Sequence, residues 1–234
     1  MTWVLARQGV AYEMEGANCI NATPFGKTSG GHPIIRTPLG VNVVINDSAP
    51  EPKPKPALGK ILLPVVFWPQ TDNKREPHRT CFSSSMAMIA HFLNPSAISG
   101  DDQYVQKVFS YGDTTDPSAQ VKALDDFGVD GSYSQKLDFD DLDKELEAGY
   151  PIGLGILHRG PLSAPTGGHW IVCRGRSEDG RIYYINDPYG SIHNGYTGPV
   201  SEGQSVGYSR EMLTARWTVE GKNSGWGMIC RKKA

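Results

Sequence analysis

The amino-acid sequence predicts an α+β domain that follows a small β-rich N-terminal segment. In the larger part of the chain helical patterns come first and antiparallel-type strands follow, which is the order expected for α+β folds. A run with alternating proline, Ser48 to Ala57, separates the two parts, since such a run favours an extended spacer. We therefore expect a β-rich module at residues 1–48, a Pro/Lys-rich linker at residues 49–60 and the α+β domain at residues 61–234.

The first part of the chain contains short β-like runs separated by glycine-rich turns. These runs are Trp3–Ala6, Pro33–Arg36 and Val41–Ile45. A unit of this size has little core of its own. Three roles stay open for it: a binding module, an oligomerisation arm, or a flap that packs on the larger domain.

Three segments of the second part have a helical pattern, and each has a stop signal. They are Phe82–Phe92, Ser118–Phe127 and Asp138–Ala148. Asn94-Pro95 follows the first, and Gly128 and Gly149 follow the other two. Acidic residues in the first turn of the third favour its start through the helix dipole.

Strands are expected after these helices. The predicted strands are Pro151–Leu157, His169–Arg174, Ile182–Asn186 and Met228–Cys230. Ser177–Gly180 joins the second and third as a hairpin turn. A hairpin returns the chain beside its start, so residues at the two outer ends of this pair come close together.

Composition excludes several classes of function. The chain has 234 residues and a net charge of -2, without the basic excess that is typical of a nucleic-acid binder. It has no apolar run of about 18 residues, so no membrane span is expected. The N-terminus lacks the pattern of a secretory signal, which predicts synthesis in the cytoplasm and delivery by other means.

No metal or other cofactor is expected. The four cysteines match no metal-binding spacing. A zinc site built on His158 and His169 would lack a third ligand with convincing spacing. Cys19, Cys173 and Cys230 are interpreted as reduced, buried residues, with a disulfide between strand residues Cys173 and Cys230 as the alternative.

A thiol, an imidazole and a carboxylate occur in the order Cys81, His169 and Asp187. Cys81 opens a predicted helix, where the dipole and free N–H groups stabilise a thiolate. His169 starts a strand after two glycines, and Asp187 ends the partner strand of the hairpin. An imidazole activates a thiol, and a third group fixes the tautomer of the imidazole. The alternatives are a core cysteine, a structural histidine and an Asx turn before Pro188.

Further residues near these positions are candidates for binding. Gln70 would pair with the Cys81 N–H to hold an oxyanion, or is an ordinary loop residue. Asn186 is a second candidate for orienting His169, although its side chain should point to the opposite face of the strand. The expected substrate contacts are Trp68, Phe82, Gly168, Trp170 and Tyr189, of which the aromatic residues suit a core equally well.

The combined motifs resemble the peptidase C39-like family, a branch of the papain-like cysteine peptidases. The matching segments are Pro64–Gln70, Cys81 on a helix, Leu142–Pro151, Gly-His169-Trp and Asn-Asp187-Pro-Tyr-Gly. The resemblance covers roughly residues 61–234. It implies a papain-like fold with Cys81 as nucleophile, His169 as base and acid, Asp187 as orienter and Gln70 as oxyanion donor. The family usually has Asp-Cys-Gly where this chain has Thr80-Cys81-Phe82, so Phe82 is expected to reshape the groove.

The first functional hypothesis is a cysteine hydrolase that cleaves peptidoglycan, as an endolysin-like endopeptidase or amidase. Compact phage lytic enzymes resemble the layout of a small module, a linker and a cysteine hydrolase. Such an enzyme would act on the bacterial cell wall after release by a separate membrane-permeabilising protein. The second hypothesis is a protein- or peptide-processing protease, such as one that removes leader peptides or an effector. The third is a catalytically inactive binding protein.

Overall fold

The computed structural model describes residues 59–233 and six short strands between Trp3 and Val44. The chain divides into two compact units, Met1–Pro54 and Lys55–Ala234. The linker expected at residues 49–60 lies outside the described residues except for Gly59 and Lys60. The division at residues 48 and 60 therefore stays a prediction.

The N-terminal unit contains two antiparallel three-stranded sheets. The first holds β1 (Trp3–Ala6), β2 (Val10–Glu13) and β3 (Cys19–Asn21), and the second holds β4 (Thr23–Lys27), β5 (Pro33–Arg36) and β6 (Asn42–Val44). The sequence predicted β1 and β5 with these bounds and β6 within one residue at each end. The side chains of this unit, including that of Cys19, lie outside the described part.

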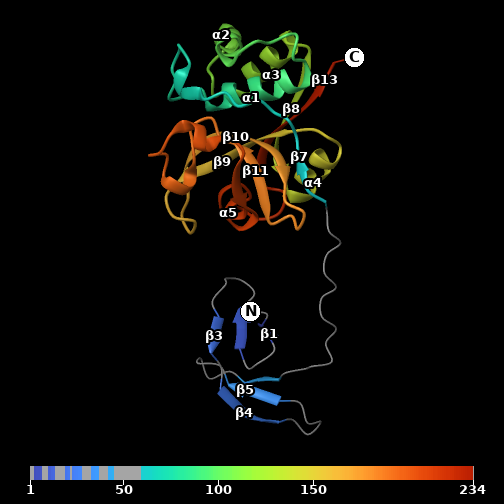
Figure 1. Ribbon diagram of the computed structural model, residues 1–234, viewed down its shortest axis with the longest axis vertical. Coiled ribbons are helices and arrows are strands. Elements are labelled where there is room, and N and C mark those ends of the chain that lie inside the picture. Colours follow the sequence, from blue (N-terminus) through green and yellow to red (C-terminus); the bar gives the residue numbers. More distant parts are fainter. Residues whose placement is uncertain are drawn as a thin grey trace. The chain divides into compact units, whose positions relative to one another are not determined.

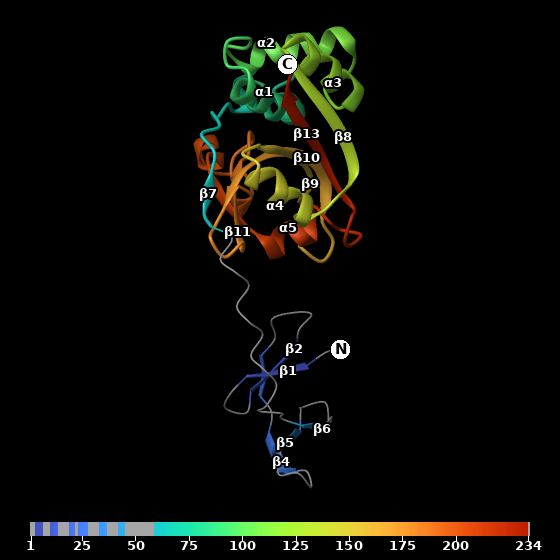
Figure 2. The same ribbon diagram turned by 90° about the vertical axis from the view of Figure 1, so that its right-hand side faces the viewer.

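A seven-stranded antiparallel sheet forms the centre of the second unit (Figures 1 and 2). Its strands are β7 (Ile61–Leu62), β8 (Val129–Leu137), β9 (Ile152–Arg159), β10 (Thr166–Arg176), β11 (Ile182–Asn186), β12 (Val206–Ser209) and β13 (Gly225–Lys232). Their order is β12-β11-β10-β9-β13-β8, and β7 pairs with β10. The predicted hairpin is β10–β11, in which Val172 pairs with Asn186.

Helices cover both faces of this sheet. The helices are α1 (Cys81–Leu93), α2 (Asp101–Tyr111), α3 (Pro117–Asp126), α4 (Phe139–Glu147) and α5 (Arg210–Arg216), and short 3-10 turns are η1 (Gln70–Asp72), η2 (Ile192–Asn194) and η3 (Val200–Gly203). Figure 1 shows α1–α3 together above the sheet and α5 below it. Val172 of β10 belongs to the core with α1–α3, and its neighbours Ile171 and Cys173 belong to the core with α4 and α5. The predicted α+β class is confirmed.

Close packing brings α1 onto the sheet. A Cβ atom added at Gly153 of β9 would lie 2.4 Å from Met86 Cε, so a larger residue there would displace the end of the Met86 side chain. Met86 and Ile89, both fully buried, lie on the side of α1 that meets Gly153. The packing sets the position of the first residue of the helix, Cys81.

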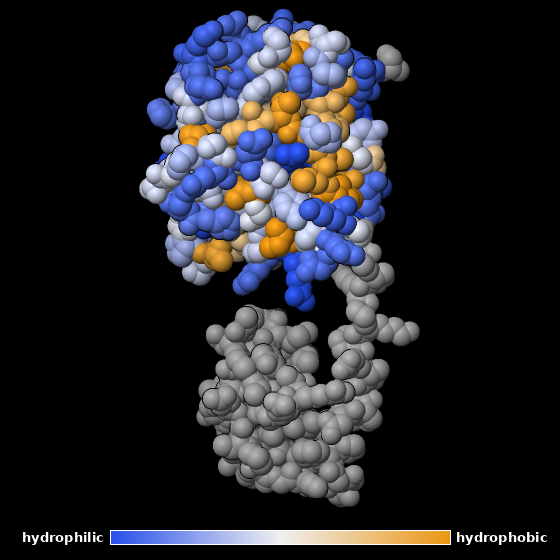
Figure 3. Space-filling view, viewed as in Figure 1, coloured by the Kyte–Doolittle hydropathy of each residue, from blue (hydrophilic) through white to orange (hydrophobic). Residues whose placement is uncertain are grey.

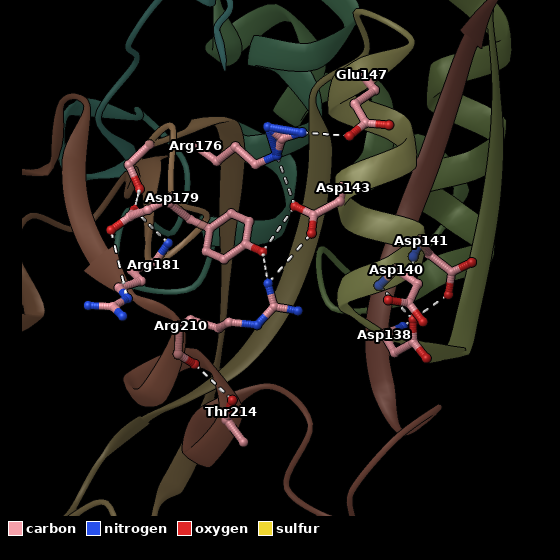
Figure 4. A network of polar contacts seen from close by, with 12 residues as sticks. Asp138, Asp140, Asp141, Asp143, Glu147, Arg176, Asp179, Arg181, Arg210 and Thr214 are labelled. Carbon is pink, nitrogen blue, oxygen red and sulfur yellow. Dashed lines mark hydrogen bonds and ion pairs between the residues drawn. The ribbon is translucent and has the colours of Figure 1, made fainter. Parts of the chain in front are cut away.

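A polar network attaches α4 to the opposite face (Figure 4). Asp143 accepts hydrogen bonds from Arg176 Nε at 3.2 Å and from the Tyr183 hydroxyl at 3.0 Å. It also forms an ion pair with Arg210 at 3.5 Å. One carboxylate therefore connects α4 with β10, β11 and α5.

The surface of the described unit is mixed. Figure 3 shows apolar residues over β7, where Leu62 is 47 % exposed, and mostly hydrophilic residues over α2.

Cys173 and Cys230 are free and buried in different cores, so the alternative disulfide between them does not form. No helix in the described part of the chain is long and apolar enough to cross a membrane.

Candidate active site

Cys81 is the first residue of α1, where backbone N–H groups have no partners within the helix. Ser85 lies one turn further along the same side and donates to the Trp170 carbonyl at 3.1 Å. The N–H groups of Trp170 and Phe82 hydrogen-bond the sulfur of Cys81. The Trp170 peptide therefore attaches α1 to β10 directly beside His169.

His169 lies in β10 with its side chain buried between Cys81 and Asp187. Its Nε2 lies 2.7 Å from Asp187 Oδ1. It also forms a side-chain hydrogen bond with Cys81. Since Nε2 faces the carboxylate, Nδ1 is the nitrogen left for the thiol. The three side chains form one continuous hydrogen-bonded chain.

Asp187 directly follows β11 and is fully buried. Besides His169, its Oδ1 accepts the Tyr189 N–H at 3.1 Å. Its Oδ2 accepts the hydroxyls of Tyr208 at 2.7 Å and Tyr196 at 3.1 Å. Burial and the charge of Asp187 raise the pKa of both tyrosine hydroxyls, so both stay protonated and donate. Four donors thus hold this carboxylate in place.

The electrostatics of the group favour a thiolate and an imidazolium. Burial alone would raise the pKa of Cys81, but the hydrogen bond and charge of His169 lower it below its ordinary value. Burial alone would lower the pKa of His169, but the charge and hydrogen bond of Asp187, together with Cys81, raise it to about 10. Both shifts are in the direction that favours a thiolate–imidazolium pair, the charge state that nucleophilic attack by sulfur requires.

Gln70 opens η1 and is buried close to the residues after Asp187. Its backbone N–H donates to the Pro188 carbonyl at 2.8 Å, and its Nε2 donates to the Pro77 carbonyl at 2.8 Å. A side-chain amide has two N–H groups, so the second remains for another acceptor. The role of Gln70 as an oxyanion donor stays a prediction.

The loop between Gln70 and Cys81 is held by a buried amide. Asn73 Nδ2 donates to the Thr80 hydroxyl at 2.9 Å and to the Ser84 hydroxyl at 2.8 Å. Ser84 in turn donates to Asp101 at 2.7 Å. The start of α1 is therefore connected both to this loop and to α2.

Asn186, the other candidate orienter, points away from His169. It donates to the Val66 carbonyl at 2.8 Å and accepts the Ser205 N–H at 3.0 Å. Its side chain is fully buried and connects β11 with the segment after β7. The structure therefore gives Asn186 a structural role and places Asp187 against the imidazole.

The expected substrate contacts separate into two groups. Tyr189 is half-buried with its ring 6.2 Å from that of His169, and Gly168 is exposed with open space around its Cα. Their roles as substrate contacts stay predictions. Trp170 is half-buried and stacks on Phe82 at 3.6 Å between ring centroids.

Phe82 and Trp68 lie elsewhere than expected for a groove wall. Phe82 is 1 % exposed and belongs to the core, so its ring packs against that of Trp170 and does not face a groove. Trp68 contacts the ring of His91, at 5.1 Å. His91 is ten residues after Cys81, or about 15 Å along α1. Phe82 lies in the core because burying a large apolar side chain is favourable, and the half-buried Trp68 packs against that core.

Three residues of this site were missed by the sequence analysis: Ser85, Tyr196 and Tyr208. Ser85 could have been found, since it lies four residues after Cys81 on the same helix face. The two tyrosines have no sequence signal, because a loop brings Tyr196 to Asp187 and the pairing of β12 with β11 brings Tyr208. The His158 ring lies 4.9 Å from that of His169.

His158 does not complete a zinc site with His169. Its Nδ1 lies 2.6 Å from the Gly167 carbonyl and must donate, and its Nε2 accepts from Arg159 Nε at 3.2 Å. Burial and the charge of His169 lower the pKa of His158 to about 4, so it is neutral at pH 7. Both of its nitrogens have protein partners.

A thiol at a helix start, hydrogen-bonded to an imidazole that a buried carboxylate orients, defines the cysteine peptidase class. The sequence profile of the Peptidase_C39 like family matches residues 62–223. The chain belongs to this family and is a cysteine peptidase with a papain-like α+β fold.

Comparison with solved structures found a double glycine motif protease from an AMS/PCAT transporter in complex with the leader peptide. It is 16 % identical to this chain, with a TM-score of 0.47, and the match covers 75 % of this chain and 95 % of that one. No curated protein matches this chain.

Proposed function

We propose that Cys81 is the nucleophile of an amide or peptide hydrolysis that proceeds through a thioester. The observation that carries this proposal is the hydrogen-bonded chain from Cys81 through His169 to Asp187. The Cys81 thiolate attacks the carbonyl carbon and forms a C–S bond while the carbonyl oxygen becomes an oxyanion. Gln70 Nε2 and the Cys81 N–H stabilise this oxyanion.

The remaining steps transfer protons through His169. Its Nδ1–H protonates the leaving nitrogen as the C–N bond breaks, which leaves a thioester and a free amine. Neutral His169 then takes a proton from water, whose oxygen attacks the thioester. The C–S bond breaks, the acid product leaves, and the thiolate–imidazolium pair returns. Asp187 holds the ring in one orientation throughout, supported by Tyr196 and Tyr208.

For the substrate we propose peptidoglycan, cut at a peptide bond or at the amide between peptide and sugar. The layout of a small β-rich unit and a cysteine peptidase unit supports this choice by analogy with phage lytic enzymes. The enzyme would act on the cell wall after a separate membrane-permeabilising protein releases it.

The test uses purified bacterial sacculi and mass spectrometry of the released fragments. We expect new amino and carboxyl ends with the intact chain and none with Cys81→Ala, and the new ends identify the bond. Sacculi that release nothing with the active enzyme would refute the peptidoglycan substrate.

A protein or peptide substrate is the second candidate, and membership of a peptidase family supports it. The same pair of proteins incubated with casein and with a peptide library separates the two candidates. If Cys81-dependent cleavage occurs there and not on sacculi, the second candidate replaces the first. If the intact chain cleaves none of these substrates, both candidate substrate classes are refuted.

A further inference from the structure

A cavity of about 440 Å³ lies beside His169. Its walls are the end of β9, the segment after Asp187, and α5. His158, Tyr189 and Tyr196 line it. Their ring centroids lie 4.9, 6.2 and 5.8 Å from that of His169. The cavity is therefore in reach of a group that is bound at the catalytic imidazole.

The position of the cavity assigns it to one half of the substrate. In the proposed reaction the acyl half stays on Cys81, and His169 protonates the nitrogen of the other half. Residues that pack around the imidazole therefore contact the leaving half. We expect this half to extend into the cavity beside Tyr189 and Tyr196.

Two positive charges line this cavity without an acidic partner. Arg216 is 8 % exposed, and its guanidinium donates to the carbonyls of Leu157 and Gly160 at 2.8 Å and of Arg159 at 3.2 Å. Its Nε is buried and has no hydrogen-bond partner. Within residues 59–233, neither Arg216 nor Arg159 forms an ion pair, and no acidic residue lines the cavity.

Arg159 is exposed and held in place by His158. Its Nε donates to His158 Nε2, while His158 Nδ1 donates to the Gly167 carbonyl. The neutral imidazole thus fixes a guanidinium at the cavity without cancelling its charge. The burial cost applies to Arg216, which is buried without an acidic partner, and an anionic ligand offsets that cost.

We propose that this cavity binds a carboxylate on the leaving half of the substrate, with Arg159 and Arg216 as its cationic partners. Guanidinium groups suit carboxylates because they donate two parallel N–H groups. The carboxylate is either the C-terminal one of the leaving residue or an acidic side chain near it. Stem peptides of peptidoglycan carry both kinds, so the inference rests on the proposed function and specifies its substrate.

The test measures binding and needs no turnover. Four probes are titrated by NMR into the full chain with Cys81→Ala: acetyl-alanine, acetyl-alanine amide, acetyl-glutamate amide and acetyl-glutamine amide. We expect at least one carboxylate probe to bind about 10-fold more tightly than its matched amide, the effect of one charge-assisted hydrogen bond. The first pair reports a C-terminal carboxylate and the second a side-chain carboxylate.

Variants locate the binding. Arg159→Gln should remove the preference for carboxylate, and Arg159→Lys should keep most of it. Arg159 is exposed, so these variants are expected to fold. The matched control is Arg181→Gln, since Arg181 is 84 % exposed and precedes β11, at the opposite end of the strand from Asp187.

Equal binding of carboxylate and amide probes would overturn the proposal, and so would a preference that Arg159→Gln leaves unchanged. Failure of the proposed function gives a different result. In that case the probes would still show the preference while sacculi and peptides stay uncut.

Discussion

Tyr208 offers the sharpest test of how Asp187 is held. Its hydroxyl lies 2.7 Å from Asp187 Oδ2 and accepts the Ile192 N–H at 3.1 Å. Tyr208→Phe keeps the ring and removes both contacts. A hydrogen bond to a charged group contributes about 1.5–3 kcal/mol, so we expect the free energy of unfolding to fall by this amount. For a unit of this size the melting temperature should fall by about 3–12 °C.

Activity should respond as well, because Asp187 supports the imidazolium of His169. If about 1.4 kcal/mol of the lost energy comes from positioning, the rate falls about 10-fold. The upper limit of the pH profile should also move to higher pH, because a carboxylate that has lost one donor attracts the proton of the charged ring more strongly.

The assay is kcat/KM against pH together with thermal unfolding, for the wild type, Tyr208→Phe and the control Tyr184→Phe. Tyr184 lies on the neighbouring strand β11, and its ring contacts Lys60. A Tyr208→Phe variant with unchanged melting temperature and pH profile would refute the reasoning.

Three other changes give distinct results. Asp187→Asn should lower kcat about 10²–10⁴-fold. The alkaline limit of the pH–rate profile should also move to lower pH, because the charge that raises the pKa of His169 to about 10 is gone. An unmoved alkaline limit would contradict this. Gln70→Ala should reduce kcat about 10²–10³-fold, and single-turnover kinetics that show no slower acylation would exclude the oxyanion role. Asp143→Ala removes one of two acidic partners of fully buried Arg176 and leaves Glu147 in place, so it should cost about 1.5–3 kcal/mol, or about 3–12 °C in melting temperature by calorimetry, whereas a shift below 2 °C would show that the network stabilises little.

Strong periodicity made most helices and strands predictable. The strand Ile182–Asn186 and the helix that begins at Cys81 follow from apolar spacing and turn residues. Their observed bounds differ from the predicted bounds by at most a few residues. The weakly patterned elements were missed. The α2 sequence is mostly polar, with Tyr104, Val105 and Val108 as its buried apolar residues. β8 lies at the sheet edge and has only its two end residues buried, so an alternating pattern is absent.

The candidate site also contains residues that the sequence predicts and residues that it does not. Chain order and local context were enough to nominate Cys81, His169 and Asp187, and the structure brings these side chains together. Tyr196 and Tyr208 could not be predicted, because their contact with Asp187 depends on loop paths and on the pairing of β12 with β11. The locations of Phe82 and Trp68 depend on which large side chain fills which part of the core.

The most direct test of the central claim is the pH dependence of Cys81 alkylation. The wild type and His169→Ala are treated with iodoacetamide over a pH series, and each cysteine is followed by peptide mass mapping. Burial raises the pKa of Cys173 and of Cys230 to about 12, so both serve as internal unreactive controls. We expect Cys81 to react fastest, at a pH well below that of an ordinary thiol, and to lose this advantage in His169→Ala. If Cys81 titrates like an ordinary thiol in both proteins, then it is not the activated nucleophile.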